Sequence, residues 1–189
     1  IGTDSALQIA SIWRAVEIRA KTVATLPLMV YSNRKGVREL DRESTLWNLF
    51  HESPNARMTP VEFWTAMLIN LHLRGNAYAR IDRSENGSAY ALWPMPADQV
   101  EMHVQENGVA IYYYSIGADL AVLAEENVLH LKEMGNGTVG LGRLDYMRAT
   151  TTESKNSQTA ATKLFTNCGK PTGILMIDRV LQKEQREAL

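Results

Sequence analysis

The strongest constraint on the fold is a long stretch that contains neither glycine nor proline. It runs from Arg143 to Cys168, follows the glycine-rich segment 140–142, and is followed by Gly169. Asn167 or Gly169 can serve as the C-cap of a helix. We therefore predict one long helix, about 35–40 Å in length at 1.5 Å per residue.

The middle of this expected helix lacks the apolar stripe by which a helix normally packs on its own core. Residues 150–159 contain no aliphatic or aromatic side chain, and the apolar anchors are at the two ends: Leu144, Met147, Leu164 and Phe165. Such a helix is expected to be solvated or to pack against copies of itself. A polar linker is the alternative, because threonine is a mediocre helix former. The well-marked ends favour the helix.

Composition excludes several classes of protein. The 189 residues carry a net charge of −1 and are 45% hydrophobic, which argues against a strongly basic nucleic-acid binder and permits an ordinary core. The single cysteine, Cys168, excludes an intramolecular disulfide framework and a cysteine-rich metal site. Neither a membrane-spanning run nor a signal-peptide pattern is present, so we expect a soluble protein in a reducing compartment. The missing initiator Met and the end at Leu189, within an apparent helix, suggest a fragment of a longer chain.

The N-terminal part is expected to begin with an amphipathic helix. Thr3 or Asp4 can cap it, and Pro27 ends it near Thr25. Its core-facing side is expected to consist of the apolar residues at helical spacing: Ile9, Ile12, Trp13, Val16, Ala20, Val23 and Ala24.

Further elements follow in quick succession. Residues 28–40 predict a hairpin with glycine in its turn, and residues 46–50 predict a short helix. The capping box of residues 59–62 starts a helix that continues to Leu73. That helix is apolar nearly all round and should form the centre of the core.

Short strands dominate the next segment. Residues 77–93 and 100–114 each predict a hairpin, the first with an Asn-Gly turn and ended by Pro94 and Pro96. Residues 120–123 and 128–131 predict two more strands. The fold class expected from this order is α+β, with helices packed on short antiparallel hairpins.

Charge is segregated along the chain although it cancels in total. Residues 101–134 hold six acids and one lysine, whereas residues 143–170 hold five bases and two acids. The bases of the long helix could contact phosphates if several copies formed a ring. The alternative is that they only keep a polar helix soluble.

One motif formally resembles a nucleotide site. Gly135, Gly137 and Gly140 match the dinucleotide-binding fingerprint, in which glycines let the backbone approach a pyrophosphate. The context does not support it: the preceding strand is not fully apolar, and the ribose-binding acid is missing at the usual distance. A flexible glycine loop before a long helix explains the same residues.

No constellation of residues indicates catalysis. The four histidines, His51, His72, His103 and His130, are scattered and form no metal-binding pair. His130 alternates with leucines in a strand, which favours a structural role, and Cys168 at a helix C-terminus would not be an activated thiolate. We therefore predict a protein that is not an enzyme and has no catalytic, cofactor-binding or metal-binding residues.

Seven stretches, taken in order, carry a resemblance to a known family. They are Val23–Tyr31, Leu49–Asn55 with Met58–Phe63, Leu73–Ala79, Ala91–Pro96, Val128–Leu131, Gly137–Gly142 and Phe165–Leu175. Together they resemble the portal proteins of long-tailed double-stranded-DNA phages of the siphovirus type. The set covers nearly the whole chain. One departure is Gly142-Arg143-Leu144, where the family usually has Ser-Pro-Leu, so the start of the long helix is less firmly capped.

This resemblance implies a division into domains. Residues 1–139 would form a wing-like α+β domain, residues 140–169 a long stem helix, and residues 170–189 the start of a small α/β clip. The returning stem helix, the tunnel loop and the crown would lie beyond Leu189.

The resemblance also implies a function without catalysis. A portal forms a ring, dodecameric in virions, at one capsid vertex, and double-stranded DNA is packaged and ejected through it without sequence specificity. Its implied partners are other copies of itself, the terminase large subunit, head-completion or adaptor proteins, the major capsid protein and the scaffold, with no membrane. The implied location is the virion, with assembly in the host cytoplasm.

Candidate site residues follow from this assignment. The residues expected to face the channel or DNA are Arg143, Arg148, Lys155 and Lys163. The residues expected to face clip partners are Lys170, Gln182 and Lys183. The competing functions are a nucleotide-binding enzyme using the loop with Gly135, Gly137 and Gly140, and another virion adaptor protein.

Overall fold

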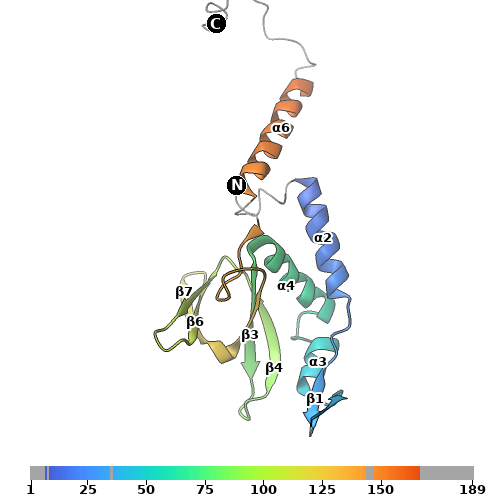
Figure 1. Ribbon diagram of the computed structural model, residues 1–189, viewed down its shortest axis with the longest axis vertical. Coiled ribbons are helices and arrows are strands. Elements are labelled where there is room, and N and C mark those ends of the chain that lie inside the picture. The colour runs from blue at the N-terminus through green and yellow to red at the C-terminus, as the bar shows by residue number, and fades with distance from the viewer. Residues whose placement is uncertain (1–6, 8, 35, 144–146, 167–189) are drawn as a thin grey trace, which may run out of the picture. The chain divides into compact units, whose positions relative to one another are not determined.

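A computed structural model describes residues 7, 9–34, 36–143 and 147–166 (Figure 1). The chain divides into two compact units, Ile1–Thr151 and Thr152–Leu189, and each is described by itself. The described part contains helices together with small antiparallel sheets, so the expected α+β class is confirmed. None of the described helices is long and apolar enough to cross a bilayer.

Two helices form one side of the first unit. Helix α4 (Pro60–Arg74) begins at the predicted capping box: the Thr59 side chain accepts from the Glu62 backbone N–H, and the Glu62 carboxylate accepts from the Thr59 N–H. Helix α2 (Ala10–Ala24) packs on α4, with Ala20 and Ala24 buried against Leu68. Small side chains at this contact let the two helices approach closely.

Helix α3 (Thr45–His51) and the hairpin of β1 (Tyr31–Arg34) and β2 (Val37–Leu40) lie between α2 and α4 in the sequence. The Ser44 side chain caps α3 by accepting from the Trp47 N–H. The short helix and the hairpin were both predicted, and both are confirmed.

A three-stranded antiparallel sheet forms the middle layer, with strand order β4-β3-β8. Its strands are β3 (Asn76–Arg83), β4 (Ala89–Met95) and β8 (Val128–Lys132). Ala77 and Ala79 of β3 are fully buried in a cluster with Phe63 and Met67 of α4. The predicted position of α4 at the centre of the core is therefore confirmed.

The second sheet has the order β5-β6-β7, formed by β5 (Val100–Val104), β6 (Ala110–Ile116) and β7 (Asp119–Ala124). A single 3₁₀ turn, η1 (Glu125–Asn127), connects β7 to β8. Tyr78 of β3, Met95 of β4 and Tyr112 of β6 are buried together between the two sheets. Because side chains alternate along a strand, β3 presents Ala77 and Ala79 to α4 and Tyr78 to the second sheet. β3 is therefore buried on both faces.

Three expectations in this unit are corrected. Helix α2 begins at Ala10, and Thr3 and Asp4 lie outside the described residues. Trp13 and Val23, expected in the core, are 53% and 46% exposed, because the contact with α4 is made mainly by the alanines. Pro94 does not end its strand but pairs with Ala79 inside β4. Proline is tolerated there because β4 is an edge strand.

The long helix does not begin at Gly140. Helix α6 is Arg148–Thr166, whereas Gly140 forms an isolated β-bridge with Gly135 and is not helical. The predicted caps Asn167 and Gly169 and the expected clip segment 170–189 lie outside the described residues. The early start was wrong because segment 140–142 is bonded to the first unit, as described below.

The burial of α4 predicts a large stability difference between two positions on the same helix. Phe63 is fully buried and Val61 is 45% exposed. Phe63→Ala should lower the free energy of unfolding by about 3–5 kcal/mol, and Val61→Ala by less than about 1 kcal/mol. Urea unfolding followed by circular dichroism measures both. Equal losses would contradict the placement of α4 in the core.

Candidate functional site

The glycine loop after β8, residues 133–143, is closed by its own backbone. Gly135 and Gly140 form an antiparallel bridge, and the Leu141 N–H donates to the Met134 carbonyl at 3.0 Å. Within the loop, the Asn136 side chain accepts from the N–H groups of Thr138 and Val139 at 3.0 and 2.9 Å. These amides bond within the protein and do not point together at a ligand.

Asn76 fixes this loop to the rest of the first unit. Its side-chain oxygen accepts from the Gly140 N–H, and its amide nitrogen donates to the Gly140 carbonyl, each at 2.8 Å. The adjacent Gly75 carbonyl accepts from the Glu133 N–H at 2.9 Å. One short segment, at the junction of α4 and β3, thus bonds to both ends of the loop.

The glycines are required by close packing. A Cβ on Gly140 would collide with the Gly75 carbonyl, one on Gly75 with the Leu141 carbonyl, and one on Gly135 with the Val139 carbonyl. Gly75 also has φ +74°, the left-handed conformation of a helix C-cap.

A dinucleotide site is not favoured by this geometry. Every strand pair in the described sheets is antiparallel, and α6 begins only at Arg148, well beyond Gly140. The fingerprint needs a parallel βαβ unit with the last glycine opening a helix. In this chain, Gly135 and Gly140 are explained by backbone packing, and Gly137 by its φ of +90°.

His130 connects the same junction to the second sheet. Its ring nitrogens lie 3.0 Å from the Asn76 side-chain oxygen and 3.2 Å from the Tyr112 hydroxyl. Burial lowers the pKa of His130 to about 4, with the Lys132 charge acting in the same direction. The expected structural role of His130 agrees with these contacts, since the ring bridges the Asn76 amide and the Tyr112 hydroxyl.

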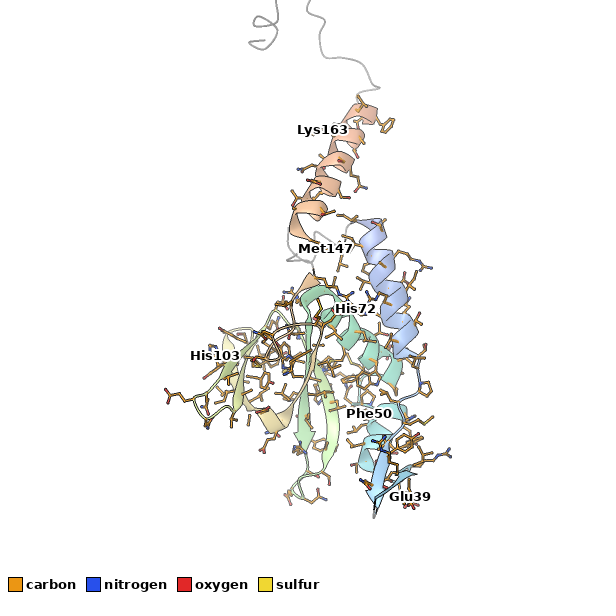
Figure 2. The ribbon with its side chains drawn as sticks, viewed as in Figure 1. Glu39, Phe50, His72, His103, Met147 and Lys163 are labelled. Carbon is orange, nitrogen blue, oxygen red and sulfur yellow. The ribbon has the colours of Figure 1, made fainter. Side chains whose placement is uncertain are left out.

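A charged cluster lies beside the loop, around the end of α4, where His72 is labelled in Figure 2. Arg143 is ion-paired with Glu133, and His72 Nδ1 is 3.8 Å from the same carboxylate. Burial lowers the pKa of His72, and Arg19 and Arg143 lower it further, while Glu133 opposes them. Among the described residues, no group of three or more His, Cys, Asp or Glu could hold a metal ion.

Arg143, one of the expected channel residues, is therefore paired with a described residue. Its charge is compensated by Glu133, although 41% of its side chain is exposed. Lys155 and Lys163 lie on α6, where Lys155 is partly exposed and Lys163 is exposed, and Arg148 is the first residue of that helix. Lys170, Gln182 and Lys183 lie outside the described residues.

Three threonine hydroxyls of helix α6 are bonded to its own backbone. The side chains of Thr159, Thr162 and Thr166 donate to the carbonyls four residues earlier at 2.8–2.9 Å. Its sequence holds three bases and one acid, a net charge of +2. At about 100° per residue, one third of its circumference carries the basic and hydroxyl side chains of Lys155, Thr159, Thr162, Lys163 and Thr166.

The sequence did not reveal the role of Gly75 and Asn76. In the sequence, Gly75 and Asn76 follow a helix expected to end near Leu73 and belong to the Leu73–Ala79 stretch of the family resemblance, and neither pattern indicates a contact with the glycine loop. The partner of Asn76 is 64 residues away, and no local pattern indicates so distant a contact. The only local signal was the αL glycine that ends α4.

Replacing Gly140 tests the packing of the loop. Gly140→Ala should destabilise the protein by about 2–4 kcal/mol, because the new methyl group collides with the Gly75 backbone. The matched control is Gly137→Asn, since nothing lies near a Cβ at Gly137 and the variant carries only the backbone strain of a φ of +90°, which Asn reduces. Chemical denaturation measures both variants. A Gly140→Ala loss no larger than that of the control would contradict the close contact.

The buried histidines predict a loss of stability in mild acid. The unfolded chain binds a proton on His130 below about pH 6.5, whereas the folded protein does so only near its pKa of about 4. Stability is therefore complete above about pH 6.5 and falls as the pH drops toward 4. His130→Gln should flatten this dependence. Melting temperatures from pH 4 to 8 measure this pH dependence. If the melting temperature of His130→Gln falls with pH as steeply as that of the wild type, the lowered pKa of His130 is contradicted.

Comparisons with known proteins agree with this architecture. Residues 10–189 match the model of the family described as phage portal protein. The portal protein of Enterobacteria phage HK97 is 31% identical over 193 residues, covering 98% of this chain and 45% of the relative. The chain thus spans about half the length, or less, of the curated portal proteins it matches.

Solved structures share the fold. The neck of an empty GTA particle, computed with C6 symmetry, is similar with a TM-score of 0.73 at 20% identity, over 94% of this chain and 50% of that one. An HK97-family phage portal protein from Corynebacterium diphtheriae has a TM-score of 0.60 at 19% identity, over 98% and 57%. Together with the family match over nearly all of its length, these similarities show that the chain belongs to the phage portal protein family.

Proposed function

We propose that this chain is part of a portal subunit that forms a ring at one capsid vertex, through which double-stranded DNA is packaged and ejected. The observation that carries the proposal is the family match across residues 10–189. The same match favours a structural role over an enzymatic one. No feature of the glycine loop favours the competing nucleotide-binding function.

The division into parts is proposed in a modified form. The wing corresponds to the layered first unit together with the glycine loop, because Asn76 and Gly75 bond the loop to that unit. The stem corresponds to α6 (Arg148–Thr166). Residues 170–189 are proposed to begin the clip, on the basis of the family resemblance.

The surface of α6 supports a role in the wall of a conduit. Its back-bonded threonines need neither water nor a ligand as a hydrogen-bond acceptor, and its net charge is small. A strongly basic wall would bind DNA tightly through counterion release, whereas DNA must move through a portal. We propose that Arg148, Lys155 and Lys163 face the channel, and that Arg143, compensated by Glu133, contributes less charge there.

The partners are proposed from the family. They are further copies of the chain in a dodecameric ring, the terminase large subunit, head-completion or adaptor proteins, and the major capsid protein and scaffold. Lys170, Gln182 and Lys183 are the proposed contacts with clip partners. The proposed location is the capsid vertex of the virion after assembly in the host cytoplasm.

Imaging of the full-length protein tests this function. Negative-stain micrographs should show closed rings with a central hole, and mass measurement should give a single large multiple of the subunit mass. The matched control is the same protein in a denaturant concentration that dissociates rings without unfolding subunits. Discrete monomers at all protein concentrations would overturn the portal assignment.

A further inference from the structure

The connector and hairpin after α2 are poorly covered by the first unit. We call residues 25–40 the N-terminal arm. Within the described part of the chain, strands β1 and β2 pair only with each other, and all four residues of β2 are exposed. A two-stranded hairpin is marginally stable at best in water unless something packs against it. The exposed large apolar side chains of the arm are Leu26, Leu28, Met29, Tyr31, Val37 and Leu40.

A second exposed apolar surface lies on the β5-β6-β7 sheet. One face of this sheet is covered, since Tyr112 packs on Tyr78 of the middle layer. On the opposite face, the register places Glu101, Tyr113 and Val122 side by side. Leu120 and Val122 are 60% and 59% exposed. We call this surface the outer sheet face, formed by Glu101, His103, Tyr113, Leu120 and Val122.

In the sequence, the segments that carry the two surfaces have opposite net charge. The arm contains three bases (Arg34, Lys35 and Arg38) and one acid (Glu39). The segment that forms the β5-β6-β7 sheet and η1, residues 100–127, contains five acids and no lysine or arginine. Exposed apolar patches mark interaction sites, and opposite charges favour specific association. The arm and the outer sheet face are therefore complementary in hydrophobicity and in charge.

The surfaces lie on different flanks of the first unit. Figure 2 shows Glu39 on the hairpin at one flank and His103 on the β5-β6-β7 sheet at the other. Helix α4 and the β4-β3-β8 sheet lie between them (Figure 1). The arm therefore cannot cover the outer sheet face of its own unit, but it can reach that face on another copy.

Two different complementary surfaces on one subunit produce a head-to-tail contact, which closes into a ring when the rotation permits. We infer that the N-terminal arm of one subunit docks on the outer sheet face of the next copy around the ring. This inference rests on the proposed portal function, and it names the surfaces by which neighbouring subunits meet. Docking would cover the hairpin that the subunit itself leaves exposed.

Charge reversal with rescue tests the pairing in the full-length protein. Arg38→Glu and Glu101→Lys, each alone, should raise the subunit concentration for half-maximal ring assembly about three- to tenfold at about 50 mM salt. The combined variant Arg38→Glu/Glu101→Lys should return it to within about twofold of the wild type. Glu85→Lys, in the exposed turn between β3 and β4, is the control and should have no effect. Mass photometry across a dilution series measures assembly.

Apolar substitutions provide a second test. Val37→Ser in the arm and Leu120→Ser on the outer sheet face should each raise the assembly concentration about tenfold or more, because each removes buried apolar contact area. Tyr90→Ser is the matched control: Tyr90 of β4 is 61% exposed and lies outside both surfaces. The melting temperature of dissociated subunits should be unchanged in all three variants.

The outcomes separate this inference from the function on which it rests. If the wild type forms rings and all variants assemble equally well, arm docking is overturned and the portal ring stands. Arm docking is also overturned if the combined variant is folded but its assembly concentration does not return toward that of the wild type. It is likewise overturned if Val37→Ser lowers the melting temperature of the dissociated subunit. If the wild type forms no rings under any condition, the proposed function itself fails.

Discussion

The contact between the Asn76 amide and the Gly140 backbone is the interaction on which the placement of the loop depends. One side chain satisfies both the N–H and the carbonyl of Gly140, as a neighbouring strand would. The same oxygen meets His130, and the preceding residue accepts from Glu133. The end of α4, the start of β3, strand β8 and the loop are therefore fixed at one point. Loss of this amide would leave several partly buried polar groups unpaired, which is costly.

The layered arrangement follows from a single strand. β3 has fully buried alanines on one face and a buried tyrosine on the other. The alanines allow α4 to approach the sheet with Phe63 and Met67 filling the space between. Tyr78 instead faces the second sheet, where its ring makes an edge-to-face contact with the ring of Tyr112. A strand covered on both sides must be central, and the rest of the unit is arranged around it.

Much of this fold could be predicted from local patterns. The capping box at Thr59, the glycines in the hairpin turns, and the alternation in β3 to β8 each depend on neighbouring residues only. Pro94 was misjudged because proline breaks most strands, and whether a strand lies at an edge is decided by the whole sheet. Trp13 and Val23 were misjudged because helical spacing identifies an apolar face without showing how much of it the neighbour covers.

The candidate site was less predictable than the fold. Gly135, Gly137 and Gly140 fitted a phosphate-binding spacing as well as a packing role, and the residues that decide between them, Gly75 and Asn76, are far away in sequence. The same contact explains why the long helix could not begin at Gly140. The spacing of the glycines did not indicate the function, whereas the family resemblance did. The resemblance rests on several short stretches in order and does not depend on any one of them.

Pro94 has a consequence beyond its own strand. β4 is an edge of the middle sheet, and Pro94 has no N–H to offer a further strand there. Two residues earlier the same edge is already occupied, since the Leu92 N–H donates to the Pro54 carbonyl. In an assembly of many copies, a sheet edge left open promotes uncontrolled strand pairing. A proline at this position discourages aggregation through the edge. Association is thereby directed toward side-chain surfaces, whose shape and charge can specify a single geometry.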